Sequence, residues 1–358
     1  MELGASIEIL DLRHFSASNL RPVLEAESEL WSSRLHWDYK ISSRLLMQYL
    51  DNHMLPGYAA LDGSQVAGFV FCVYEETKAI IGDVFAPAGP ARSEAAAHAI
   101  EETLLRHLLE LLLNSPQVDR VESQLLIRPS GAHSTIFRDA GFDIYRRLFL
   151  VQDLTESLAQ NLVQNLQGNS TPPHVNLPPN LQLRPWSDDD LAPAARLISA
   201  AYAGHTDSLI NDQYRSIHGS MRFLNNIVRY SGCGTFSPQA SHVIVDRGTR
   251  ELAALVLGSR VSSRSGHITQ VCVHPEFRRR GLARMLLSLV SYWFTRQGAS
   301  EISLTVTEAN RDAIDLYLSK GYVRAHSFDA AVWQREPRIG PEDTEKIDLI
   351  RKPSVSRF

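Results

Sequence analysis

The chain runs through the same order of expected strands and helices twice, and this repeat constrains its fold more than any other feature. The first half reads as strand 7–10, helices to about residue 50, hairpin strands 57–61 and 66–74, strand 79–85, helix 95–113, strand 118–127, helix 134–140 and strand 145–150. The second half reads as strand 181–185, helices from 188 to about 227, hairpin strands 242–246 and 252–260, strand 268–273, a helix to 296, strand 302–306, a helix to 320, and strands 323–326 and 330–334. The repeat predicts two copies of one αβ unit.

The length and the connecting segment fit this division. A chain of 358 residues is long enough for two domains, each with its own core. Residues 155–167 are expected to form a linker helix, and the proline-rich stretch 168–179 cannot hold regular hydrogen-bonded structure. We therefore expect a first domain at 1–153, a linker at 154–180, a second domain at 181–336 and a tail at 337–358.

Composition excludes several classes of function. The net charge of −4 argues against a general nucleic-acid binder, and no apolar run approaches the roughly 18 residues of a membrane span. An acid stands near the N-terminus where a secretory signal carries basic residues, so a cytoplasmic protein is expected. Cys72, Cys233 and Cys272 show no metal-ligand spacing, so we expect neither a metal site nor a disulfide framework. The oligomeric state is left open between monomer and homodimer.

Residues 271–287 read as strand, basic loop and helix. Pro275 ends the strand, and apolar residues recur at helical spacing from Leu282 onward. Backbone N–H groups of such a loop, together with the unpaired donors of a first helical turn, suit a phosphate or pyrophosphate. Gly281 allows close approach of the backbone, and Ala283 keeps the first turn slim. Taken alone, a solvated basic loop fits the same residues equally well.

Two ordered motifs decide between these interpretations. The pattern V-x-V-x-P-x-x-R-R-x-G-x-A over 271–283 resembles the acetyl-CoA-binding motif of the GNAT superfamily of N-acetyltransferases. The pattern N-x-x-A-x-x-L-Y-x-x-x-G-Y over 310–322 resembles the second motif of that family. The resemblance implies an α/β (α+β) fold of two GNAT-like domains, each with a mixed, mostly antiparallel central sheet flanked by helices. It also implies an N-acetyltransferase that uses acetyl-CoA as cosubstrate and a primary amine as acceptor.

The resemblance carries roles over to particular residues. Backbone N–H groups of 278–283 would hold the pyrophosphate, the strand end would pair with the pantetheine amides, and Tyr317 would be the general acid. Asn310 is either a helix N-cap or a contact to the cosubstrate. The residues assigned to acetyl-CoA are Cys272, Val273, Arg278, Arg279, Arg280, Gly281, Leu282, Ala283 and Asn310.

The general base and the acceptor pocket are less well defined. In the ribosomal-protein branch of the family a glutamate lies five residues before the asparagine, and Thr305 stands at that position here. Glu308 is the candidate base, with His267, or Gln270 acting through water, as alternatives. Polar and aromatic residues before the hairpin are expected to bind the acceptor, either a small amine or a protein N-terminus: Asp207, Asn211 and Tyr214.

Comparison of the two copies predicts that only the second is active. The first copy has a single arginine, Arg92, in the corresponding loop, where Pro90 removes a backbone donor and Glu94 brings negative charge to the helix start. It also has Phe137 where the second copy has Tyr317. The alternative function is a non-catalytic acyl-CoA-binding or sensing scaffold, against which the retained tyrosine argues.

Overall fold

The computed structural model describes residues 7–90, 92–157, 176–230 and 234–336. The first half forms ten helices and strands: β1 (Glu8–Asp11), α1 (Ala17–Leu35), α2 (Lys40–Asp51), β2 (Gly57–Asp62), β3 (Gln65–Glu75), β4 (Lys78–Phe85), α3 (Glu94–Asn114), β5 (Arg120–Gln124), α4 (Ser134–Asp139) and β6 (Asp143–Asp153). This order is the one expected from the sequence. The predicted linker helix and proline-rich connector lie largely outside the described residues, as does the tail.

The second half repeats the order. Its elements are β7 (Leu181–Pro185), α6 (Leu191–Ala201), α7 (Asp207–Ile210), α8 (Ile217–Arg229), β8 (Thr235–Phe236), β9 (His242–Asp246), β10 (Leu252–Arg260), β11 (Ser265–Val273), α9 (Leu282–Arg296), β12 (Glu301–Thr307), α10 (Arg311–Leu318) and β13 (Val323–Gln334). The two strands expected at 323–326 and 330–334 are one strand, with a register shift between Arg324 and His326. No helix among the described residues is long and apolar enough to cross a membrane.

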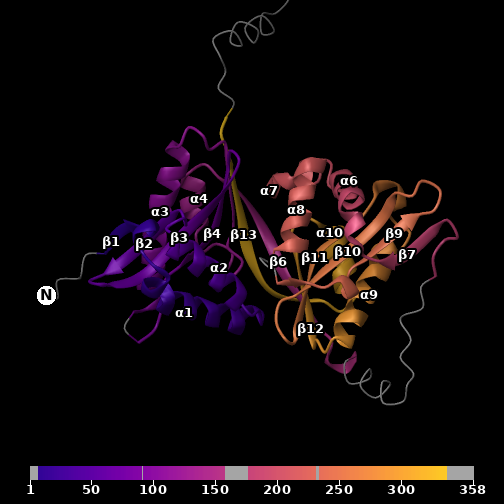
Figure 1. The fold of residues 1–358 in the computed structure, drawn as a ribbon, viewed down its shortest axis with the longest axis horizontal. Coiled ribbons are helices and arrows are strands. Elements are labelled where there is room, and N and C mark those ends of the chain that lie inside the picture. The colour runs from indigo at the N-terminus through magenta and orange to yellow at the C-terminus, as the bar shows by residue number, and fades with distance from the viewer. Residues whose placement is uncertain (1–6, 91, 158–175, 231–233, 337–358) are drawn as a thin grey trace, which may run out of the picture.

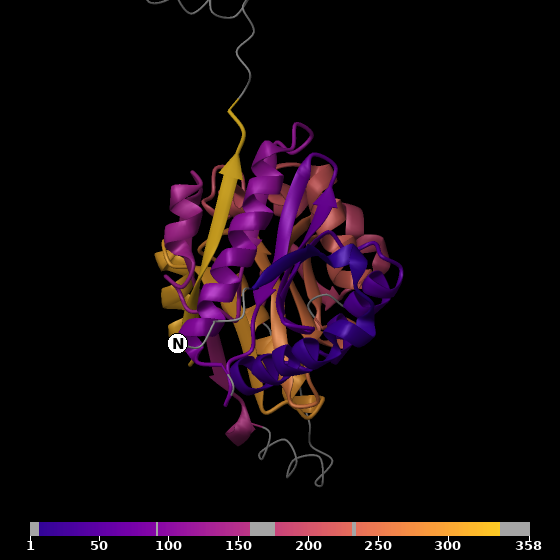
Figure 2. The same ribbon diagram turned by 90° about the vertical axis from the view of Figure 1, so that its left-hand side faces the viewer.

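The two halves exchange their last strands, so they share one sheet. The order is β1-β2-β3-β4-β5-β13-β6-β12-β11-β10-β9-β7. Strand β6 of the first half pairs with β12, and β13 of the second half pairs with β5. Figure 1 shows both strands at the middle of the molecule, and Figure 2 shows the yellow β13 running among first-half elements. The sequence predicted that 145–150 closes the first unit; instead this strand completes the sheet of the second.

In each half the hydrogen-bonded ladder between the two parallel strands stops partway along them, and we call this place the interruption. The β10–β11 ladder passes from Leu257↔Gln270 to Gly258↔Ile268, which leaves Thr269 unmatched as a bulge. The parallel β11–β12 ladder ends at Ile268↔Leu304. Residues 269–273 and 305–307 therefore face each other without a ladder between them. The first half has the same interruption, because its parallel β4–β5 ladder ends at Ile81↔Ser123.

Helices cover both faces of the second-half sheet. On one face, α9 and α10 pack over β10–β12 with Leu286, Leu287 and Phe294 fully buried. On the other face, α6 and α8 cover the inner residues of β9–β11. The Phe294 ring lies so close to the strands that a Cβ on Gly266 would stand 2.7 Å from it. Glycine is therefore required there, and the packing holds α9 against the strand that leads into its loop.

Candidate active site

The loop before α9 presents an open helix N-terminus. Gly281 is the N-cap residue with φ of 78°, and no side chain caps the first turn. Arg279 also has positive φ, at 64°. The backbone turns here in a way that glycine adopts without strain, and the N–H groups of Leu282 and Ala283 are left for another acceptor. This geometry suits an anion at the start of α9.

The three arginines of this loop differ in their contacts. Arg278 donates a hydrogen bond to the Ala201 carbonyl over 2.7 Å and so ties the loop to the end of α6. Arg280 donates to the Glu276 carbonyl, and its guanidinium lies over the Phe277 ring. Arg279 pairs with Asp312 over 3.3 Å, but both side chains are more than four-fifths exposed (86% and 88%), so the pair is weak. Arg279 and Arg280 are the two that can turn toward a ligand at little cost.

Only one of the two residues assigned to the end of β11 turns its backbone toward the interruption. His274 donates its N–H to the Ala253 carbonyl on β10. Along a strand, the N–H and C=O groups of successive residues point alternately to one neighbouring strand and to the other. The N–H and C=O of Cys272 therefore face β10, whereas those of Val273 face the region opposite β12. Cys272 offers that region no backbone group, and its assignment to acetyl-CoA stays a prediction. Its thiol is buried, and burial raises its pKa.

Tyr317 lies at the same interruption, on α10. Its side chain is buried in the core beneath α9 and its ring centroid is 5.9 Å from that of Tyr322. Burial, with the neighbouring Asp207 and Cys272, raises the pKa of the phenol, and Arg147 opposes this shift. The phenol is therefore protonated at neutral pH, as a general acid must be.

Asp207 brings a carboxylate to this phenol from the opposite face of the sheet. It is the first residue of α7, its side chain is 13% exposed, and it accepts a hydrogen bond from the Thr307 hydroxyl at the end of β12. Its other oxygen lies 3.6 Å from His205 Nδ1. The Thr307 hydroxyl thus holds this carboxylate, whose charge acts on the phenol of Tyr317.

Two stacked tyrosines lie beside Asp207. Tyr202 and Tyr214 have ring centroids 4.5 Å apart, and the Tyr202 hydroxyl donates to Gln270 Oε1 over 3.0 Å. Burial raises the pKa of both phenols, and Asp207 adds to the shift. Asn211, the third residue expected at the acceptor, caps the short helix 212–215 by accepting from the Gln213 N–H and also acts on the phenol of Tyr214, so its role at the acceptor stays a prediction.

The remaining assigned residues occupy different positions. Asn310 is the N-cap of α10, accepting from the Ala313 N–H, while its predicted contact to acetyl-CoA stays a prediction. Glu308 lies about 4 Å from two arginines, 4.0 Å from Arg146 and 3.9 Å from Arg324, which compete with any amine for its carboxylate. Its role as base stays a prediction, but the carboxylate close to Tyr317 is Asp207.

His267, one of the two alternative bases, is a core residue. Its Nδ1 lies 2.9 Å from the Ser303 hydroxyl, and its ring packs edge-on against Trp37. Burial and Arg147 lower its pKa to about 3. The ring is therefore neutral at pH 7, and so weak a base does not take a proton from an ammonium group.

Arg147 was not found from the sequence. It lies on the exchanged strand β6, donates to Gln124 Oε1 over 2.7 Å, and reaches Thr305 with a longer contact of 3.4 Å. Its charge lowers the pKa of Tyr214 and Tyr317, in each case against the larger effect of burial. No signal in the sequence indicates this, because only the exchange of strands brings a first-half residue to the second-half site.

The first half also anchors the segment that carries Asp207. The buried Lys78 on β4 pairs with Asp212 over 2.6 Å and with Glu75 over 3.2 Å. Arg120 on β5 donates to the Leu209 carbonyl over 2.6 Å, just after Asp207. Breaking such buried pairs leaves an uncompensated charge, so this anchorage fixes the position of α7.

The first copy has filled the corresponding places with its own side chains. By strand register Ala86 corresponds to Val273, and its N–H donates to the buried Glu101 carboxylate over 2.9 Å. The Ser93 hydroxyl caps α3 by accepting from the Ala96 N–H. Arg92 is bound to Asp62 and to the Ala67 carbonyl. The N–H that corresponds to that of Val273, and one N–H in the first turn of α3, are therefore already used.

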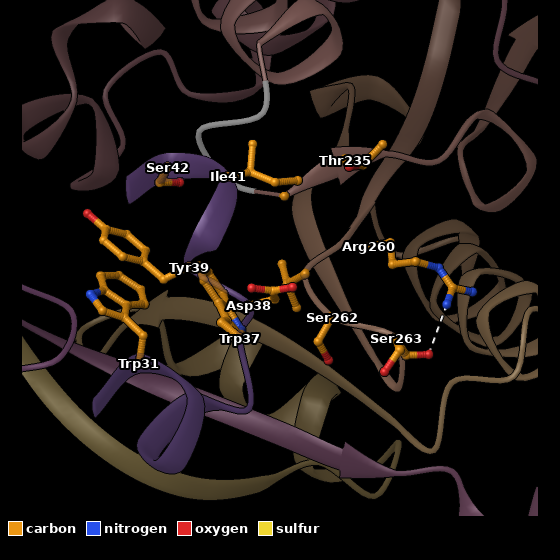
Figure 3. Close-up of a pocket in the computed structure, with 12 residues that line it drawn as sticks. Trp31, Trp37, Asp38, Tyr39, Ile41, Ser42, Thr235, Arg260, Ser262 and Ser263 are labelled. Atoms are coloured by element: carbon orange, nitrogen blue, oxygen red, sulfur yellow. Dashed lines mark hydrogen bonds between the residues drawn. The ribbon is translucent and has the colours of Figure 1, made fainter. Parts of the chain in front are cut away.

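Two cavities lie away from these residues, where the first half meets the second. The smaller, of about 190 Å³, is bordered by Trp31, Trp37 and Tyr39 on one side and by Arg260 and Ser262 on the other (Figure 3). The larger, of about 1250 Å³, adjoins it, and the residues that line it include His36 and Glu301, which pair with each other. Neither is bordered by Tyr317, Asp207 or the α9 loop, so the candidate site rests on local geometry and not on a large empty pocket.

A family model matches part of the second half, and solved structures share the fold of both halves. Residues 209–322 match the family model described as the acetyltransferase (GNAT) family. A GCN5-related N-acetyltransferase from Sphaerobacter thermophilus is similar over 92% of this chain and 96% of its own, with 13% identity and a TM-score of 0.60. A tandem GNAT protein from the clavulanic acid biosynthesis pathway is similar over 93% and 99%, with 16% identity and a TM-score of 0.55. At these identities the likeness shows a shared two-domain fold.

Proposed function

We propose that this protein is an acetyl-CoA-dependent N-acetyltransferase whose one active site lies in the second half, and the match of residues 209–322 to the GNAT acetyltransferase family model supports this. The observation that carries the proposal is the meeting of three features at the β11–β12 interruption. These are the uncapped start of α9, the inward backbone of Val273 and the buried, protonated Tyr317. The acceptor is a primary amine, on a small molecule or a protein N-terminus.

The donor side fits acetyl-CoA. The N–H groups of Leu282 and Ala283 would hold the pyrophosphate, with charge from Arg279 and Arg280. The backbone of Val273 would pair with the pantetheine amides like an added strand. Acetyl-CoA supplies an acetyl group on a thioester. Holding it by its unreactive parts leaves that group free at the interruption, beside Tyr317.

Asp207 and Tyr317 would divide the proton transfers. Asp207 holds the ammonium form of the acceptor, which loses a proton to water before it attacks. The neutral amine nitrogen then bonds to the acetyl carbon as the carbon–sulfur bond breaks, and this nitrogen loses a second proton to water as the amide forms. Tyr317 gives its phenolic proton to the departing sulfur and is reprotonated from solvent. Amines with a pKa near 8 are favoured, since about a tenth of them is neutral at pH 7.

The competing function is a scaffold that binds acyl-CoA without turnover. The buried hydroxyl of Tyr317 argues against it, because a binding protein has no use for a proton donor beside the acetyl group. Loss of this donor should cost about 10²–10⁴-fold in kcat, the usual range for general acid catalysis.

The experiment measures CoA release from acetyl-CoA with a panel of amines, for the natural protein and for Tyr317→Phe. Tyr322→Phe is the matched control, because it removes a hydroxyl from a buried tyrosine whose ring is 5.9 Å away. We expect turnover with at least one amine, a large fall in kcat for Tyr317→Phe and little change for Tyr322→Phe. Saturable binding of acetyl-CoA without turnover on any amine would favour the scaffold.

A further inference from the structure

Three side chains of the first half come together away from the proposed active site. His98 and Glu101 lie one turn apart on α3, and His133 immediately precedes α4. Their nitrogen and carboxylate oxygen atoms all lie within 4.8 Å of one another. Both helices lie on the outer side of the first half, away from α9 and α10 (Figure 1).

The spacing within this cluster is close to that around a single metal ion. His133 Nε2 is 3.3 Å from Glu101 Oε2. Ligands on a tetrahedral zinc with bonds of about 2.1 Å are about 3.4 Å apart. The rings of His98 and His133 have centroids 5.0 Å apart, and two imidazoles on one such ion would be about 5 Å apart. The arrangement therefore needs only a small rotation of the partly exposed His98.

The ring of His133 has no hydrogen bond to any described residue, and its Nε2 only approaches Glu101 Oε2 at 3.3 Å. The His133 side chain is 2% exposed. A buried polar group without a partner costs free energy, so its presence calls for an explanation. A metal bond to one of its nitrogens would supply the missing partner.

The surroundings also carry more negative than positive charge. Glu27, Asp83 and Glu101 are all at most 2% exposed, and Arg128 is the cation that contacts this group, through its ion pair with Glu101. Burial raises the pKa of Glu27 and Asp83, and Arg128 opposes that shift. A divalent cation bound by Glu101 would add positive charge to this acidic surrounding and reduce the cost of burying it.

We propose that His98, Glu101 and His133 form a binding site for a divalent transition metal such as zinc. Two imidazoles and one carboxylate are ligands that zinc accepts, with water or the neighbouring Glu102 in the fourth position. Glu101 binds the ion through one oxygen while its other oxygen keeps the Ala86 N–H and Arg128. The site is structural: it joins α3 to α4 in the half that has lost its acetyl-CoA site.

The test is a metal titration of full-length, untagged protein after dialysis against EDTA. Zn²⁺ content is measured by mass spectrometry, and Co²⁺ binding by the visible absorption of a tetrahedral ion. His98→Ala removes a ligand that is 43% exposed, so the variant should fold. His107→Ala, on the same helix but outside the cluster, is the control; the ring of His107 contacts the Thr103 carbonyl.

We expect one equivalent of metal per chain, an affinity at least tenfold lower in His98→Ala, and unchanged binding in His107→Ala. A metal-dependent rise in melting temperature should appear in the natural protein and the control, but shrink in His98→Ala. The proposal is overturned if no metal is bound, or if His98→Ala binds it as tightly as the natural protein does.

Discussion

Replacing Gly281 by alanine separates the strain of a loop from its role in holding a phosphate. Gly281 has φ of 78° and a Cβ placed there meets no atom within 4 Å. The change therefore adds no clash within the protein, only the cost of a left-handed backbone, roughly 1–2 kcal/mol for a residue other than glycine. A smaller opposing effect of about 0.4–1 kcal/mol comes from stiffening the unfolded chain. The net loss of folding free energy should be about 1 kcal/mol.

Gly298, at the other end of α9, is a closely matched control. Its φ is 84° and a Cβ there also meets nothing within 4 Å. Gly298→Ala should therefore lose about the same folding free energy. If the backbone at Gly281 lies against a pyrophosphate, only Gly281→Ala should also weaken acetyl-CoA binding, by about tenfold or more, which corresponds to about 1.4 kcal/mol.

The assay is calorimetric titration of both variants with acetyl-CoA, beside denaturant unfolding to compare their stability. Equal dissociation constants for Gly281→Ala and the natural protein would refute a phosphate site at the start of α9. Equal weakening in both variants would show that the effect comes from general destabilisation of the helix.

Three further predictions concern the acceptor side. Asp207→Asn should raise KM for a cationic amine about tenfold or more and leave KM for acetyl-CoA within about twofold. Steady-state kinetics measures both constants. Equal rises in the two KM values would argue against a role of Asp207 in holding the amine. Arg147→Met, which removes a partly buried charge that acts on Tyr317 and Tyr214, should lower kcat with a smaller effect on acetyl-CoA binding. Unchanged kcat would remove Arg147 from the site. Because the pKa of Tyr317 is raised, its phenol stays protonated in alkaline solution. The value of kcat/KM should therefore rise with pH as the amine loses its proton, and it should not fall again below about pH 10. A fall in kcat/KM that begins near pH 8 would contradict this.

The duplication and the order of elements could be predicted because local patterns carry them. Apolar spacing places α9, and Pro275 ends the strand before its loop. Comparing the loops of the two copies was also informative: Ser93 and Arg92 are tied to the protein in the first, whereas the corresponding turn of α9 is open. These features depend on residues close together in the chain.

The exchange of strands could not be predicted in this way. β6 and β13 have similar lengths and patterns, so either can pair with β5 or β12, and the choice depends on packing between distant segments. The sequence therefore also contains no sign that the exchanged strand β6 brings Arg147 to the candidate site. The same limit applies to Glu308, whose arginine partners lie on exactly these two strands.

The central claim is that one half of this chain kept an acetyl-CoA site and the other lost it. Calorimetric titration of the full-length protein with acetyl-CoA tests this directly. We predict one equivalent bound per chain, with binding weakened by Gly281→Ala. Two equivalents would show that the first half still binds the cosubstrate, and no binding would contradict the assignment of the second half.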